Sequence, residues 1–203
     1  MSAIVLRTPE NIVNYALTRA GSPLRVDNLL NGTRASNAAL RVYGQTRDEL
    51  LSGGDWDFCE RTVQATLLKQ APADYITTPW TLAYPQLPWL YEYAYPTDAL
   101  KVRAVKRQPI QVPNFDPRYN RFDVANDDGF TPPQKVILTN IPAAIIVYAG
   151  QETNPLNWTP EFIEVFADAL GKALAPVLVS PDIVKLPAAE EAADTQLPGM
   201  RHG

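Results

Sequence analysis

Proline sets the firmest limits on how this chain can fold. The 203 residues include 19 prolines, and two internal segments, 71–88 and 108–133, are rich in them. Proline lacks a backbone hydrogen-bond donor and turns the residue before it away from helical conformation. We therefore expect these two segments to be loops, with room for one short strand at residues 119–124.

Three other segments have the apolar spacing of amphipathic helices. Thr8 and Pro9 suit the start of the first, because threonine caps helices and proline fits the first turn. The second ends at Gly53-Gly54, where glycine tolerates positive φ. A third starts at Pro160 and has a wide apolar face. We expect helices near residues 9–20, 34–52 and 160–179.

Between the second and third helices, the apolar spacing changes to the two-residue alternation of β-strands. We expect a β-sheet lobe over about residues 62–149. The strands predicted within it are 62–68, 89–95, 100–107, 119–124, 135–139 and 144–149. The turn-like Asn140-Ile141-Pro142 predicts that the last two strands pair as a hairpin.

These elements predict an α+β fold, a small helical bundle with a β-sheet lobe, over residues 1–179. Residues 180–203 hold three prolines and have little to bury. Such a segment cannot form a core of its own and should become ordered only on another chain. We therefore expect an extended C-terminal tail over 180–203.

Histidine and cysteine are too scarce for several kinds of catalytic site. The one histidine is His202, and the one cysteine is Cys59. A Cys/His zinc site, a Ser-His-Asp triad or a Cys-His pair would have to use these two residues. We expect no catalytic residue, no metal or cofactor site, and no enzymatic activity.

The overall charge gives no attraction for DNA or for anionic membranes. Eighteen basic and 22 acidic residues leave a formal net charge of −4. No apolar stretch is long enough for a membrane span, and Met1–Leu6 does not resemble a signal peptide. We expect synthesis in the cytoplasm and no membrane anchor.

Two groups of acidic residues are candidate chemical sites. Asp55, Asp57 and Glu60 offer paired carboxylates of the kind that glycosidases use, although a turn that hydrogen-bonds its own backbone explains Asp55 as well. The second group lacks the spacing of a calcium-binding loop and predicts a solvent-exposed turn: Asp123, Asp127 and Asp128.

Two rows of side chains, one basic and one aromatic, are candidate contact surfaces. Lys101, Arg103 and Arg107 share a parity and predict a basic stripe on one sheet face. The stripe either discourages edge pairing or contacts DNA or an acidic partner. An aromatic row predicts half of a core or a subunit contact rather than a base-stacking platform: Trp89, Tyr91, Tyr93 and Tyr95.

The order of these pieces resembles a known family. A long helix begins near Ala35-Ser36-Asn37-Ala38, and Trp56-Asp57-Phe58 leads into Val63–Leu68. Tyr93–Val102 joins an aromatic strand, a proline-aspartate turn and an apolar strand, and Ala144–Tyr148 is followed by Trp158 and a Phe-rich helix. From about Pro9 to Leu178, this order resembles the head-to-tail adaptors of tailed bacteriophages, the family of tail tubular protein A.

The resemblance implies a non-enzymatic virion protein at the neck of the phage. Such a protein would form a ring on the portal protein, dodecameric like the portal, and join it to tail nozzle or tail-tube proteins. The ring would extend the DNA channel after genome packaging, and genomic DNA would pass without sequence-specific binding. The tail is then the candidate portal-docking segment, with these contact residues: Ser180, Ile183, Val184, Leu186, Leu197, Met200 and Arg201.

Two alternatives stay open at this stage. The chain could be another neck protein, such as a head-completion or tail-terminator protein. It could also be a small carbohydrate-active enzyme or lysin that uses Asp55, Asp57 or Glu60. For contacts between copies in a ring, the exposed side of the helix over 36–51 is the first candidate.

Overall fold

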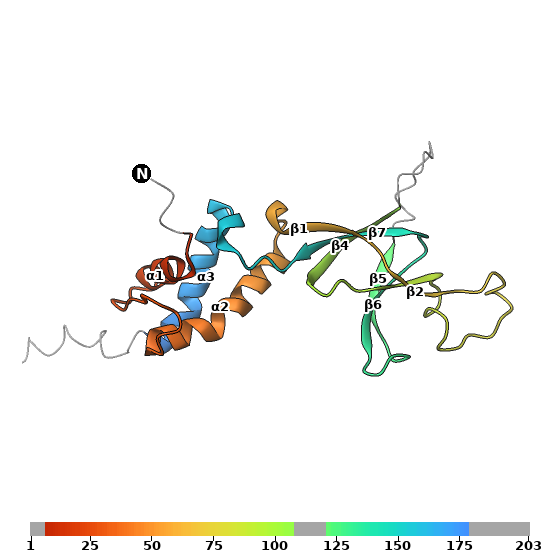
Figure 1. Ribbon diagram of the computed structural model, residues 1–203, viewed down its shortest axis with the longest axis horizontal. Helices are drawn as coiled ribbons and strands as arrows, with labels where there is room; N and C mark the ends of the chain where they lie inside the picture. The colour runs from red at the N-terminus through yellow and green to blue at the C-terminus, as the bar shows by residue number, and fades with distance from the viewer. Residues whose placement is uncertain (1–6, 108–120, 179–203) are drawn as a thin grey trace, which may run out of the picture. The chain divides into compact units, whose positions relative to one another are not determined.

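The computed structural model describes residues 7–107 and 121–178 (Figure 1). The described residues form two compact units. The first unit combines the chain up to Arg47 with the chain from Asn154, and the second unit runs from Asp48 to Thr153. The domain predicted over 1–179 therefore contains two units, and the predicted tail, with its seven contact residues, lies outside the described residues.

The three predicted helices are confirmed. They are α1 (Pro9–Arg19), α2 (Arg34–Gly53) and α3 (Pro160–Leu178). The side chain of Thr8 caps α1 by accepting a hydrogen bond from the backbone N–H of Asn11, at 3.3 Å. Both α1 and α3 belong to the first unit, whereas α2 begins in the first unit and ends in the second.

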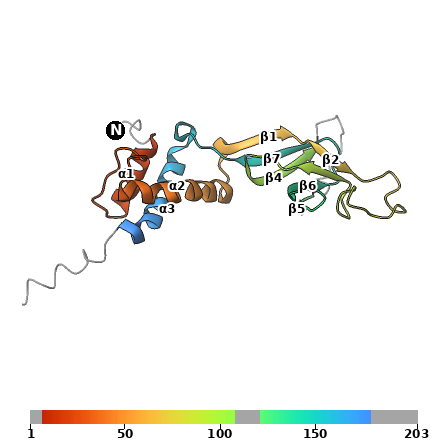
Figure 2. The ribbon, with the colours of Figure 1, turned by 60° about the horizontal axis from the view of Figure 1, so that its bottom comes forward.

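The first unit is held together by a close helix pair and an aromatic cluster. Helices α1 and α3 pack side by side (Figure 2). Trp158, which is buried, lies with its ring centroid 5.1 Å from that of Phe162 and 5.2 Å from that of Phe166. Tyr43 of α2 completes the cluster with its ring 5.0 Å from Phe166. Edge-to-face packing of this kind adds to the free energy gained by burying the rings.

The second unit contains two antiparallel sheets. One sheet has the strand order β1-β7-β4, and the other has the order β2-β3-β6-β5. The strands are β1 (Glu60–Gln64), β2 (Leu67–Gln70), β3 (Tyr91–Ala94), β4 (Ala99–Arg107), β5 (Phe122–Asp127), β6 (Gln134–Thr139) and β7 (Ala144–Gly150). These strands and the three helices confirm the α+β class.

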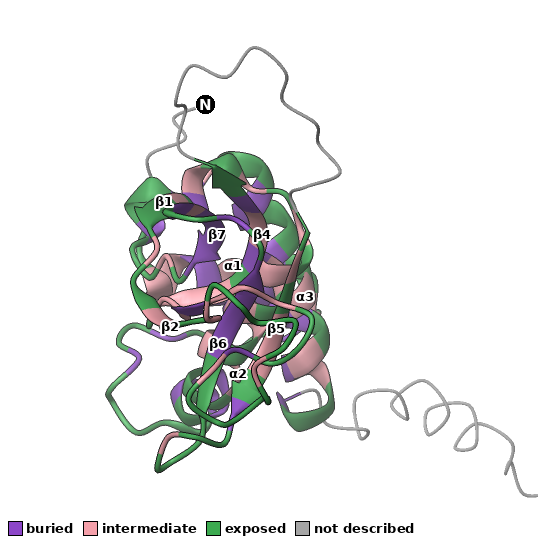
Figure 3. Cartoon of the chain, turned by 90° about the vertical axis from the view of Figure 1, so that its right-hand side faces the viewer, coloured by how far each residue is buried: buried purple, intermediate pink, exposed green. Residues whose placement is uncertain are grey.

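One core joins the two sheets. Tyr93 and Ile137 from one sheet are buried with Val105 and Ile146 from the other. Figure 3 shows β6 and β7 largely buried. The predicted aromatic row partly supplies this core, because Tyr93 lies within it while Tyr91 and Tyr95 pack against it.

The predicted strand over 62–68 is two strands in different sheets. β1 pairs with β7, and β2 pairs with β3. Ala65 still donates a backbone hydrogen bond to Ala144 at 2.8 Å, whereas the carbonyl of Thr66 already accepts one from Ala94 at 2.9 Å. The chain therefore passes from one sheet to the other between these two residues.

The predicted hairpin of the last two strands is wrong. β6 pairs with β3 and β5, while β7 pairs with β1 and β4. The connection between them carries Ile141, which is buried, and its carbonyl accepts a hydrogen bond from the Tyr93 hydroxyl at 2.9 Å. Because Ile141 is anchored in the core, the connection leads the chain across the core into the opposite sheet instead of folding back beside β6.

Candidate interaction surfaces

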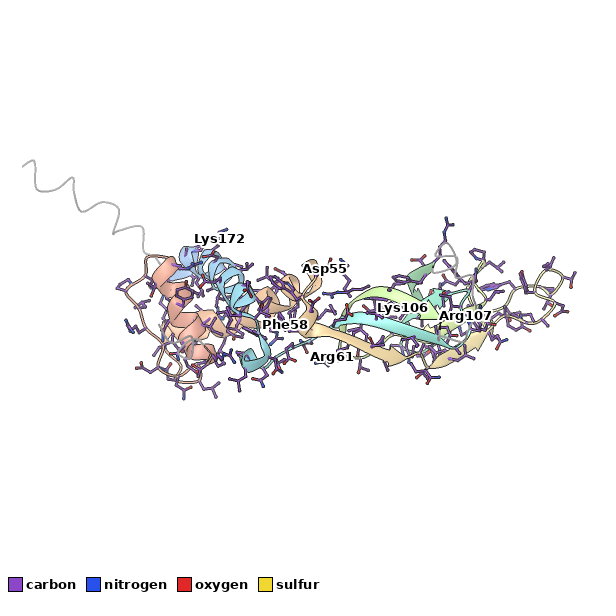
Figure 4. The ribbon with its side chains drawn as sticks, turned by 90° about the horizontal axis from the view of Figure 1, so that it is seen from above. Asp55, Phe58, Arg61, Lys106, Arg107 and Lys172 are labelled. Atoms are coloured by element: carbon purple, nitrogen blue, oxygen red, sulfur yellow. The ribbon has the colours of Figure 1, made fainter. Side chains whose placement is uncertain are left out.

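The three acids considered for catalysis lie where α2 leads into β1 through a short 3-10 turn, Asp57–Cys59. All three are exposed; Figure 4 labels Asp55, whose side chain is 99% exposed. The Glu60 carboxylate accepts a hydrogen bond from Arg103 at 3.2 Å. Asp55 lies 3.9 Å from the same guanidinium, so two of the three acids are paired with Arg103 on an exposed surface.

Trp56, between these acids, closes the C-terminal end of α2. Its indole N–H donates a hydrogen bond to the carbonyl of Leu50 at 3.0 Å. The ring lies so close over Gly54 that a Cβ there would be 2.4 Å from the indole nitrogen. The same Leu50 carbonyl also accepts a backbone hydrogen bond from Gly54 at 3.1 Å, so the indole adds a second hydrogen bond at the end of the helix.

Arg103 is an internal link rather than part of a contact stripe. Its side chain, only 14% exposed, donates to the carbonyl of Gly54 at 2.9 Å as well as to Glu60. The pairing of β4 with β7 shifts register between Val102 and Ala104. The stripe was predicted from a regular alternation of side chains, and the bulge interrupts that alternation. The prediction that Lys101, Arg103 and Arg107 share one face is therefore wrong.

Three cations on β4 do reach the surface. Lys101, Lys106 and Arg107 are exposed, and none is ion-paired with another residue of the described chain. Figure 4 places Lys106 and Arg107 near each other along β4. Lys101 and Arg107 therefore stay candidates for a contact with an acidic partner, while Arg103 does not have the exposure for that role.

A buried charged cluster lies at the other sheet, where the sequence predicted a solvent-exposed turn. Asp127 is buried and forms an ion pair with Lys69, and its other oxygen accepts a hydrogen bond from the Gly129 N–H at 2.9 Å. Asp123 and Asp128 are exposed as predicted. The prediction is therefore wrong for Asp127.

Glu92 completes this cluster from the neighbouring strand β3. Its side chain is 1% exposed, and its Oε1 atom lies 3.7 Å from Lys69 Nζ without a hydrogen-bond partner among the described residues. Burial, with the nearby Asp127, raises the pKa of Glu92 to about 7. Burial acts in the same direction on Asp127, but hydrogen bonds from Lys69 and Gly129 hold its pKa below the usual value.

This cluster was not predicted from the sequence, although one signal for it is present. Glu92 interrupts the aromatic row between Tyr91 and Tyr93, so a charge in the centre of a core strand was visible. Its partners Lys69 and Asp127 come from strands far apart in the chain. Only the pairing order of the second sheet brings these two residues to Glu92.

A third network joins β1, β7 and the turn before β4. Asp98 forms an ion pair with Arg61 and accepts a hydrogen bond from the Tyr148 hydroxyl at 3.0 Å. The backbone carbonyl of Asp98 also accepts from Gln151 N–H at 2.9 Å. Asp98 thereby fixes the start of β4 against the end of β7.

Comparison with known proteins places the chain in no family. No protein-family model matches it, and no curated protein shows significant sequence similarity to it. Within residues 7–107 and 121–178, none of the helices combines the length and apolar character needed to cross a bilayer. The same residues contain no cluster of three or more metal-ligating His, Cys, Asp or Glu side chains.

Proposed function

We propose that this chain is a structural connector of the bacteriophage neck, a head-to-tail adaptor. Copies of the chain form a ring on the portal protein, join it to the tail nozzle or tail-tube proteins, and extend the DNA channel after genome packaging. The ring matches the dodecameric portal, and the protein belongs to the virion. Genomic DNA passes through it without sequence-specific recognition.

The observation that carries this proposal concerns the residues on which the resemblance rests. Several of these residues hold secondary-structure elements together. Trp56 closes α2, Asp98 ties β4 to β1 and β7, and Trp158 is the centre of the aromatic cluster of the helical unit. Residues that fix how elements join are those expected to persist in a family whose members share architecture rather than chemistry.

The arrangement of the chain also supports the proposal. The β-sheet unit begins within α2 and ends before α3, so both ends of the described chain belong to the helical unit. A connector needs separate surfaces for its neighbours in the ring, for the portal and for the tail. In this proposal, the two compact units and the C-terminal tail provide these surfaces.

Sedimentation of the purified chain, alone and mixed with its portal ring, tests the proposal. We expect a species heavier than the portal that contains many bound copies of the chain, because adaptor assembly follows the portal ring. A chain that stays a monomer in the presence of the portal would contradict the proposal.

The same experiment separates the proposal from its closest alternative. A tail-terminator or head-completion protein would bind the tail tube, or a portal that already carries an adaptor, and would not bind the bare portal ring.

The exposed acidic residues give a further control. Asp55→Ala and Asp57→Ala should leave portal binding unchanged, whereas a lysin would lose turnover on cell-wall carbohydrate through the same substitutions.

A further inference from the structure

The loop between β2 and β3, residues 71–90, extends beyond the end of the sheets of its unit (Figure 1). Asp74 is its only charged residue. Ile76 is 84% exposed and Leu87 is 64% exposed, and three more large apolar residues of the loop are exposed: Tyr75, Trp80 and Leu82. An exposed apolar surface of this kind marks a binding site on a folded protein.

Hydrogen bonds within the loop give it a defined shape. The Trp80 indole donates to the carbonyl of Pro85 at 2.8 Å. Successive turns are closed by backbone hydrogen bonds from Thr78 to Asp74 at 3.0 Å and from Trp89 to Gln86 at 2.9 Å. A loop that is already ordered loses little conformational entropy when a partner covers it.

The chemistry of the loop argues against a small ligand and against a membrane. The hollow between its aromatic and proline side chains measures about 30 Å³, whereas pockets for small molecules measure roughly 300–1,000 Å³. Segments that lie on anionic membranes carry lysine or arginine beside their apolar residues, and this loop carries none. These features favour a protein surface that itself carries little charge.

Such a surface is present on the same unit. The segment Thr62–Leu68, which includes most of β1 and the start of β2, has no charged residue, and its Val63 and Leu67 are exposed. In the described chain, β1 and β2 are outer strands of their two sheets. Outer strands present free backbone groups, and proteins ordinarily protect them with charges.

The opposite outer strand is protected in that ordinary way. β4 closes the other side of the first sheet and carries the exposed cations Lys101, Lys106 and Arg107. The uncharged segment Thr62–Leu68, which Arg61 and Lys69 flank, therefore differs from β4. Its exposed Val63 and Leu67 stand among uncharged polar side chains, and the segment therefore suits contact with the nearly uncharged 71–90 loop.

We infer that the 71–90 loop of one copy packs on the Thr62–Leu68 edge of a second copy. A contact between two loops would leave the edge uncovered, whereas a contact between loop and edge covers both surfaces. Because the two surfaces differ, the contact is head-to-tail and adds copies in one direction. Such a contact yields a ring when the rotation from one copy to the next divides a full turn evenly. This inference rests on the proposed ring and names its contact, in place of the α2 surface expected from sequence.

Charge substitution in the loop tests the inference. We expect Ile76→Asp to abolish assembly of the chain with the portal ring in sedimentation, at unchanged circular dichroism. Leu30→Asp is the matched control, because Leu30 is 82% exposed but lies in the helical unit, and this variant should assemble like the wild type. Assembly of Ile76→Asp at wild-type stoichiometry would overturn the inference.

Disulfide cross-linking identifies the partner surface. Single variants Ile76→Cys and Leu67→Cys are mixed under mild oxidation, and we expect a linked dimer from the mixture but not from either variant alone. Native Cys59 gives little background because it is buried, and burial raises the pKa of its thiol. A dimer formed by Ile76→Cys alone would show a loop-to-loop contact and overturn the inference.

The outcomes separate this inference from the proposed function. If the wild-type chain does not bind the portal, both the proposed function and the loop contact are wrong. A wild-type ring on the portal, together with an Ile76→Asp variant that forms the same ring, removes only the loop contact. If that variant assembles but no longer binds the tail protein, the loop faces the tail, and the second-copy assignment is wrong.

Discussion

At the scale of single residues, the cluster of Lys69, Glu92 and Asp127 shows how one cation is shared by two buried carboxylates. Lys69 forms a hydrogen-bonded ion pair with Asp127, whereas Glu92 Oε1, 3.7 Å from Lys69 Nζ, has no hydrogen-bond partner among the described residues. The proton therefore favours Glu92, since burying a second unpaired negative charge would cost more. Because the pKa of Glu92 is raised, the stability of the β-sheet unit depends on pH.

Glu92→Gln should stabilise the protein at alkaline pH and have little effect in acid. The folded-state pKa of about 7 lies above the ordinary value of 4.5, so the folded state binds the proton more tightly than the unfolded state. The wild type therefore loses stability as the pH rises from about 4.5 to 7, whereas the amide carries no such penalty. We expect the variant to gain about 1–3 kcal/mol in free energy of unfolding at pH 8.

Urea unfolding at pH 5 and at pH 8 measures this difference. Glu49→Gln is the control, because it makes the same chemical change at an exposed position of α2, outside the buried cluster. A Glu92→Gln effect that is equal at the two pH values would show that Glu92 is charged in the folded protein throughout this range.

At the scale of secondary-structure elements, the contact between α1 and α3 depends on a position without a side chain. A Cβ added at Gly171 of α3 would lie 2.8 Å from the backbone carbonyl oxygen of Ala16 in α1. Because that neighbour is backbone, the helices would have to move apart. The close packing of this pair therefore requires glycine at 171, although glycine is a poor helix former.

Gly171→Ala should lower the free energy of unfolding by about 1–3 kcal/mol, as overpacking does. Gly44→Ala in α2 is the matched control, because a Cβ there meets nothing within 4 Å. The control should be stabilised by up to about 1 kcal/mol through better helix propensity. Thermal unfolding followed by circular dichroism at 222 nm, roughly the helix minimum, compares the two variants, and a shift of the same sign in both would contradict this account.

The bulge in β4 determines which of its side chains are buried. β4 keeps two buried valines, Val102 and Val105, three positions apart, because a bulge lies between them. The bulge sends Arg103 to Glu60 and Gly54, where it ties the end of α2 to both β1 and β4. A simple alternation cannot reveal such a link, since the extra residue changes which side chains share a face.

At the scale of the whole molecule, folding and proposed docking are assigned to different parts of the chain. Residues 180–203 hold three prolines and have little to bury, so we expect the core to form without them. Removal of residues 180–203 should therefore leave the circular dichroism spectrum and the unfolding transition nearly unchanged, while portal binding falls at least tenfold. Sedimentation with the portal ring measures the binding, and a scrambled order of the same residues is the control for length and composition.

The docking assignment of the tail fails if the shortened chain binds the portal like the full chain. In that case, the exposed cations of β4, Lys101 and Arg107 among them, become the next surface to change. A narrower version of the test keeps the tail and replaces Leu186 and Leu197 with aspartate. These two substitutions should weaken portal binding, because they place charge at the apolar positions of an otherwise polar segment.

The amino-acid sequence by itself determined the α+β class, the three helices and the position of most strands. These features follow from local causes: Pro9 and Gly53 limit helices, and apolar spacing identifies buried faces. Strand partners were decided only by the tertiary structure. β6 and β7 joined different sheets, and Lys69 met Asp127, because burial of Ile141 and the cross-sheet core are contacts between residues far apart in the chain, which local patterns do not encode.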